Sequence, residues 1–108
     1  MLEKTDFALL ATATTESYLN TTLSNVNDHV VKMSVMTSPY PWHSHPNSDE
    51  TFIGVEGIVI IETKEQTMEL TPGSSITIPK NMIHRTSPKG ARSVNLTIEK
   101  VDIQTKFA

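Results

Sequence analysis

Hydrophobic and polar residues alternate along most of the chain after about residue 18. A period of two places successive side chains on opposite faces of an extended strand, so the pattern predicts a series of short β-strands. In "HVVKMSVM", residues 29–36, we expect the face with Val31, Met33 and Val35 to point into the fold. "RSVNLTIEKV", residues 92–101, alternates most regularly and predicts a half-buried strand.

Proline and glycine mark where the predicted strands end. Gly57 permits the positive φ of a tight turn, so residues 51–64 are predicted to form two strands joined there. The Pro-Gly pair at 72–73 suits a type II turn. The Pro-Lys-Gly sequence at 88–90 predicts another turn. The residues expected on the inner face of these strands are Met33, Val35, Phe52, Ile76, Ile78 and Leu96.

Short strands without a strong amphipathic helix predict an all-β fold, an antiparallel sandwich or barrel over residues 17–102. Residues 1–16, with "FALLATATTES", are predicted to be an N-terminal arm or a short helix. A chain of 108 residues suits a single domain, residues 1–108. Because a small barrel often covers its edge strands by pairing with a second copy, we expect a homodimer.

The charge, apolar runs and cysteine content of the chain exclude several classes of partner and of chemistry. Nine basic residues against twelve acidic ones give a net charge of -3, so no nucleic-acid partner is expected. No apolar run approaches the roughly 20 residues of a membrane span, and no membrane association is expected. The segment "FALLATAT" is short for an export signal and follows acidic residues. The chain has no cysteine, which excludes disulfides and thiolate chemistry, and a cytoplasmic location is expected.

Two of the four histidines, His43 and His45, lie in "WHSHPNSDE". Their spacing points both imidazoles to one face of a strand, although on spacing alone a solvated loop is an equal interpretation. A turn after His45 could return the carboxylate of Glu50, and His84 offers a third imidazole. Three imidazoles and a carboxylate suit one divalent transition-metal ion, namely Fe, Mn, Ni, Zn or Cu.

Tyr40, Trp42 and His29 are not expected to bind the metal ion. Tyr40 and Trp42 have the strand parity opposite to His43, so both are expected on the outer face or in a dimer contact. His29 lies outside the pattern and is expected to be an ordinary hydrogen-bonded histidine.

Two stretches, "HSHPNSDETFIGVEG" and "GSSITIPKNMIH", resemble the two sequence motifs of the cupin superfamily. The matching positions are His43, His45, Glu50, Gly57, Gly73, Pro79 and His84. The fifteen residues between Gly57 and Gly73 resemble the compact spacing of small single-domain microbial cupins. Three positions depart from the motifs, namely Thr37, Asn81 and Pro88, and they concern turn geometry, since none is a metal ligand.

The resemblance implies a jelly-roll barrel, also called a double-stranded β-helix, with one metal ion held by His43, His45, Glu50 and His84. Four protein ligands leave coordination positions open, as in catalytic sites. One hypothesis is an oxygenase, isomerase or lyase that acts on a small oxygen-rich organic molecule, with Glu50 as an additional proton acceptor. The other is a non-catalytic barrel that binds or senses a sugar, metabolite or metal ion, because a fold does not fix a function.

Overall fold

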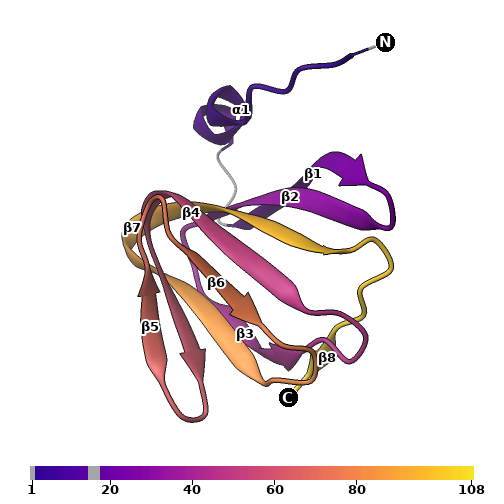
Figure 1. Ribbon diagram of the computed structural model, residues 1–108. Helices are drawn as coiled ribbons and strands as arrows, with labels where there is room; N and C mark the ends of the chain where they lie inside the picture. The colour runs from indigo at the N-terminus through magenta and orange to yellow at the C-terminus, as the bar shows by residue number, and fades with distance from the viewer. Residues whose placement is uncertain (1, 15–17) are drawn as a thin grey trace.

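The computed structural model describes residues 2–14 and 18–108, which form one short helix and eight strands (Figure 1). These elements are α1 (Phe7–Ala13), β1 (Tyr18–Val26), β2 (His29–Met36), β3 (Tyr40–Ser44), β4 (Glu50–Thr63), β5 (Thr67–Leu70), β6 (Ser75–Ile78), β7 (His84–Lys100) and β8 (Lys106–Phe107). The predicted boundary between arm and barrel at residues 16–17 lies outside the described residues. Among the described residues, no helix is long and apolar enough to cross a membrane.

The strands pair antiparallel in two layers that share the long strands β4 and β7 (Figure 1). In one layer, the C-terminal half of β7 lies between β2 and the start of β4, and β1 and β6 form its edges. In the other layer, the N-terminal half of β7 lies between β3 and the end of β4, and β5 and β8 form its edges. The hydrogen-bonded ring is not closed, but the predicted all-β antiparallel architecture is confirmed.

Two predicted turns are wrong, because the glycines concerned lie inside long strands. Gly57 has φ 66° within β4, where the pairing with β7 changes register. A Cβ atom at Gly57 would come within 2.5 Å of the Arg92 carbonyl oxygen, so glycine is required there for space as well as for φ. Gly90, with φ 95°, lies within β7 in the same way. These irregularities let each strand bend from one layer to the other, whereas the turn predicted at residues 72–73 does separate β5 from β6.

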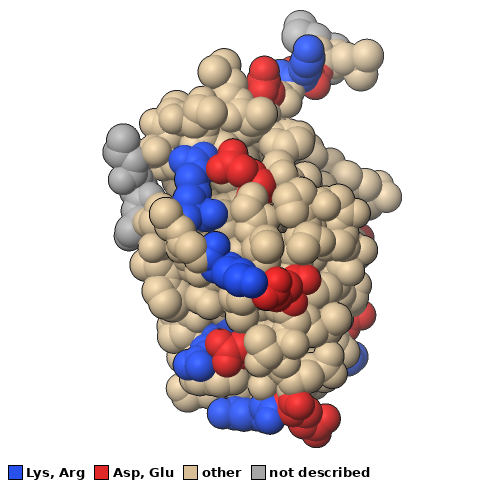
Figure 2. Space-filling model, turned by 90° about the vertical axis from the view of Figure 1, so that its left-hand side faces the viewer, with Lys and Arg blue, Asp and Glu red and all other residues tan. Residues whose placement is uncertain are grey.

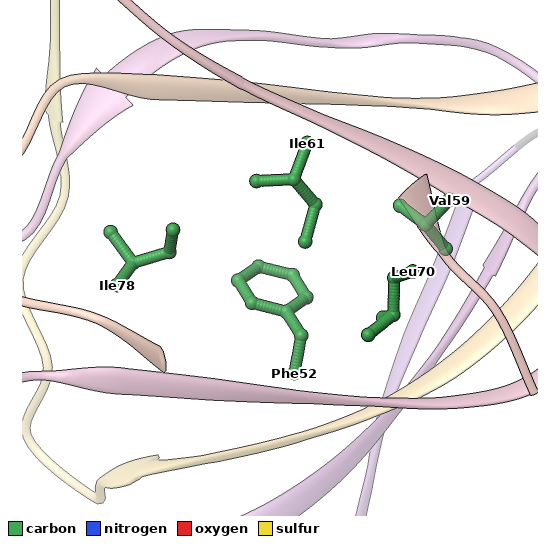
Figure 3. Packing of buried hydrophobic residues seen from close by; sticks show 5 residues of the cluster. All are labelled: Phe52, Val59, Ile61, Leu70 and Ile78. Carbon is green, nitrogen blue, oxygen red and sulfur yellow. The ribbon is translucent and has the colours of Figure 1, made fainter. Parts of the chain in front are cut away.

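The inner apolar core lies between the two layers (Figure 3). It consists of Phe52, Val59, Ile61, Leu70 and Ile78, all buried. The ring of Phe52 faces the other four side chains in the close-up view. Strands β4, β5 and β6 supply all five residues, so burial of this cluster joins both ends of β4 to its two edge partners.

A second core lies on the outer face of the β1–β2–β7 layer, under α1. Ala11 of the helix packs with Met33, Val35 and Val94, and Phe7 lies against the same cluster. Asp6 caps the helix by accepting a hydrogen bond from the Leu9 amide at 3.1 Å. The expectation that Met33, Val35 and Leu96 point into the barrel is therefore wrong: all three pack in the cluster beneath the helix.

The polar side chains that alternate with these apolar ones on β2 and β7 face the interior of the barrel. The residues that face it from β2 and β7 include Lys32, Ser34, Asn95, Thr97 and Glu99. An alternating strand with one apolar face is usually buried on that face. Here α1 covers the apolar face, so the polar face is free to line a cavity.

Basic and acidic side chains lie in adjacent pairs down one side of the molecule (Figure 2). The pairs on β4, β5 and β7 are Arg92–Glu56, Lys89–Glu69 and Arg85–Glu62, with N–O distances of 3.0, 2.8 and 3.0 Å. Pairs this exposed contribute about 0–1 kcal/mol each, so the two apolar cores dominate the stability of the fold.

Candidate metal centre

The fold brings together the four residues that the sequence singled out. His43 lies in β3 opposite His84, the first residue of β7, and Glu50 is the first residue of β4. His45 follows β3 by one residue. One donor atom from each lies within 4.8 Å of all the others, and all four residues are buried. Donor atoms held at about 2.0–2.2 Å from one ion lie about 3–4.4 Å apart, so a small inward shift of the four side chains would bring them to metal-ligand distances.

Backbone carbonyls fix the orientation of all three imidazoles. The Nδ1 atoms of His43, His45 and His84 lie 2.7, 2.9 and 2.9 Å from the carbonyl oxygens of Pro41, Gln104 and Met82. A carbonyl oxygen only accepts, so each Nδ1 carries the proton and each Nε2 keeps its lone pair. This tautomer is the one that metal-binding histidines adopt.

The inward-facing atoms lack partners within the protein. Nε2 of His45 and His84 and Oε1 of Glu50 are buried and make no hydrogen bond of good geometry. Glu50 Oε1 lies 3.3 Å from His45 Nε2 and 3.5 Å from His84 Nε2. Buried polar atoms are rarely left unpaired. Two aligned imidazole nitrogens and a carboxylate oxygen around one point, with His43 beside them, fit a divalent transition-metal ion.

The protonation states also suit metal ligands. Burial lowers the pKa of His43 to about 4, so this imidazole is neutral at pH 7. Burial alone would raise the pKa of Glu50, but the imidazoles of His45 and His84, whose Nε2 atoms lie 3.3 and 3.5 Å from Oε1, hold it well below its usual value. Burial alone would lower the pKa of His45, but the Glu50 carboxylate and the Gln104 carbonyl raise it overall. Glu50 is therefore ionised at neutral pH, and His45 takes up a proton at higher pH than His43 does.

A cavity of about 250 Å³ opens onto these residues. Its lining includes His43, His45, Glu50 and Phe52. Glu99 is buried beside Glu50, and its pKa is raised by burial and by that neighbouring carboxylate. The Lys32 ammonium lies 3.4 Å from Glu99 on the same wall. The space beside the four residues can thus admit a small polar molecule.

Tyr40 lines this cavity, so the expectation that it lies on the outer face is wrong. Its ring meets the ring of His43 edge-on, with 4.8 Å between centroids. The pairing of β3 with β7 shifts register between Tyr40 and His43, and a one-residue irregularity reverses which face a side chain occupies. Trp42 packs against two cations instead, with Lys64 Nζ 4.2 Å and Arg85 Cζ 4.6 Å from the ring centroid. His29 is a surface histidine, paired with Asp28 at 2.9 Å.

Two of the motif departures are accommodated locally. Asn81 has φ 70°, a left-handed conformation that asparagine tolerates. Its backbone amide donates a hydrogen bond to the His45 carbonyl oxygen at 2.9 Å. Pro88 lies within β7, opposite Val59.

The C-terminal segment, residues 101–108, was not recognised from the sequence as part of the site. The Gln104 carbonyl orients His45, and Asn47 holds the segment in place. Asn47 Nδ2 donates to the Asp102 carbonyl at 3.0 Å, and its Oδ1 accepts from the Gln104 amide at 2.8 Å. These partners are backbone groups distant in sequence, so no residue type marks them. Asn47, inside "HPNSD", was the one side chain that could have been singled out.

We expect Asn47→Ala to weaken the affinity for a divalent ion about tenfold, because partners that orient a ligating histidine typically contribute 10–100-fold. Titration of the metal-free protein with Zn²⁺ by isothermal calorimetry measures it. Asn25→Ala, at an exposed position in β1, is the matched control and should bind as the parent does. Equal affinities for both variants would refute the role of the C-terminal segment.

Comparison with known proteins agrees with this architecture. The family model described as Cupin domain matches residues 29–98. The YdbB protein of Bacillus subtilis (strain 168) is 41% identical over 97 residues, covering 89% of this chain and 85% of YdbB. The crystal structure of a cupin-2 domain containing protein from Shewanella frigidimarina has a TM-score of 0.82 at 25% identity, covering 89% of this chain and 93% of that one.

A second similar structure is the DMSP lyase DddQ from Ruegeria pomeroyi, with a TM-score of 0.74 at 16% identity. The alignment covers 85% of this chain and 52% of the lyase, and identity at this level indicates a shared fold alone. The match to the family model spans more than half of the chain and both sequence motifs. The chain therefore belongs to the cupin family, as a small single-domain member with the double-stranded β-helix fold.

Proposed function

We propose that this cupin is a metal-dependent enzyme, an oxygenase, isomerase or lyase, that acts on a small oxygen-rich organic molecule. One divalent transition-metal ion, such as Fe, Mn, Ni, Zn or Cu, would be held by His43, His45, Glu50 and His84. The observation that carries the proposal is the set of buried, unpartnered donor atoms that converge beside a cavity. A closed structural site would have no such cavity.

When bound, a divalent ion would polarise a substrate oxygen and acidify coordinated water. The protein's own groups have separate tasks. Glu50 is ionised, as a ligand must be, and its position on the cavity wall supports its proposed second role as a proton acceptor. Phe52 contributes a buried apolar side chain to the lining of the cavity.

Elemental analysis of freshly purified protein tests the metal, with near-stoichiometric Fe, Mn, Ni, Zn or Cu expected. Turnover is tested on the metal-loaded protein with dihydroxy and diketone compounds, by oxygen uptake and by product chromatography. Stoichiometric metal with saturable binding but no turnover of any compound would favour the non-catalytic barrel. Protein that neither contains nor binds divalent ions would overturn the proposal.

Metal affinity should fall on acidification because a proton competes at His45. Its pKa in the metal-free protein is raised above 6.5, so the site binds a proton progressively as the pH falls through that pKa. We expect an apparent affinity at least about tenfold lower at pH 5.5 than at pH 8. His43 adds to the loss only near pH 4. Calorimetric titration at each pH measures this, with circular dichroism to verify folding; a constant affinity would contradict it.

We also propose that two copies associate through the outer face of the β1–β2–β7 layer. Ile98 in β7 is 37% exposed, and Leu9 and Leu10 of α1 are 66% and 42% exposed. Exposed apolar side chains on neighbouring elements are typical of interaction surfaces. Light scattering coupled to gel filtration should give a mass of two chains, and Ile98→Lys should give one. A single-chain mass for the parent protein at micromolar concentration would refute the dimer.

A further inference from the structure

The cavity beside the candidate metal centre carries a second polar cluster that metal ligation does not use. Lys32 of β2 lines it, and among the described residues that line it Lys32 alone is a lysine or arginine. Its side chain is 26% exposed, and the ammonium lies beside Glu99, which lines the same cavity. One contact engages it, with Glu99 at 3.4 Å, and an ammonium group has three donors. Lys32 can therefore accept a further negatively charged partner.

Asn95 of β7 supplies the complementary feature. Its side chain lines the same cavity and is fully buried, and its Oδ1 has no hydrogen-bond partner. Its Nδ2 already donates to the Leu96 carbonyl at 3.3 Å. The group left unpaired is thus an acceptor, which a hydroxyl of a bound molecule can satisfy.

The net charge of the cavity with a metal ion bound also favours a negatively charged ligand. A divalent ion and Lys32 bring three positive charges to the cavity, against at most two negative charges from Glu50 and Glu99. With neutral imidazoles, the loaded cavity is electropositive. Burial strengthens this field, so a negatively charged molecule is favoured over a neutral molecule of the same shape.

We infer that the substrate is a small hydroxylated carboxylate, with its carboxylate paired to Lys32 and a hydroxyl donating to Asn95 Oδ1. This inference rests on the proposed function for the ion that shares the cavity. It narrows an oxygen-rich molecule to an acid, and it makes Lys32 and Asn95 the residues that determine specificity. Neutral sugars and polyols would offer no second negative charge to the Lys32 ammonium, which would keep Glu99 as its one charged partner.

The experiment uses the Zn²⁺-loaded full chain and three probes with the same three-carbon chain: glycerate, glyceramide, which lacks the charge, and propionate, which lacks the hydroxyls. We expect calorimetry to give at least tenfold tighter binding of glycerate than of either other probe. Lys32→Met should reduce the preference for glycerate over glyceramide to less than threefold, and Lys32→Arg should retain most of it. Asn95→Ala should reduce the preference for glycerate over propionate.

Lys100→Met is the matched control, since Lys100 lies on β7 outside this cavity and its loss should change neither preference. Metal content measured before and after each titration separates the two proposals. A protein without metal refutes the proposed function. A loaded protein that binds glycerate and glyceramide equally refutes this inference and leaves the proposed function standing, and the parent protein alone decides that point if the Lys32 variants do not fold.

Discussion

Glu50→Gln is expected to weaken binding of a divalent ion by about 100-fold or more, while the protein stays folded. The replacement preserves volume, and its amide can donate hydrogen bonds to His45 and His84, whose Nε2 atoms lie 3.3 and 3.5 Å from Glu50 Oε1. The substitution removes the one negative charge among the four ligands. Loss of a ligand should exceed the 10–100-fold effect of an outer hydrogen-bond partner.

Calorimetric titration with Zn²⁺ measures the effect of Glu50→Gln, and thermal unfolding without metal verifies the fold. His29→Ala is the control, because His29 lies on the surface away from the site and its loss should leave the affinity unchanged. An affinity for Glu50→Gln within threefold of the parent value would exclude Glu50 as a ligand.

Leu70→Ala is expected to lower the free energy of unfolding by about 2–5 kcal/mol. Leu70 has no exposed surface and packs in the cluster with Phe52 and Val59, so its removal leaves a cavity in the inner core (Figure 3). Typical domains unfold with about 5–15 kcal/mol, so this loss is a large part of the total.

Urea unfolding monitored by circular dichroism measures the loss. Met68→Ala, on the same strand β5 but 42% exposed, is the matched control and should cost less than about 1 kcal/mol. Comparable losses for the two variants would show that the inner core is not where the stability of the fold resides.

The strands of this protein could be predicted from alternation, but their lengths could not. The sequence predicts a hairpin turn at Gly57 and another turn at Gly90, because glycine occurs both in tight turns and in bulges. The local sequence does not distinguish a turn from a bulge. The pairing of β4 with β7 identifies bulges, since it continues on both sides of each glycine. That pairing joins residues far apart in the chain.

The four candidate ligands were predictable because their positions match the two cupin motifs, and the structure brings all four together. The cavity wall was not predictable, because the alternating pattern places Ser34, Asn95 and Thr97 on the face of each strand that is expected to face solvent. A signal was present: these side chains are short and uncharged, whereas exposed strand positions often carry charge. Only the packing of α1 on the opposite face shows which parity is inside. Localisation in the cytoplasm stays a prediction.

The uneven anchoring of the four ligands has a kinetic consequence. Glu50 and His84 begin the two long strands that both layers share, so displacing them requires most of the fold to open. His45 is oriented instead by residues 101–108, whose pairing with β3 involves the two-residue strand β8. Segments with few hydrogen bonds open locally far more often than the whole domain unfolds. Ions should therefore enter and leave the folded protein at a rate set by fluctuations of its C-terminal segment.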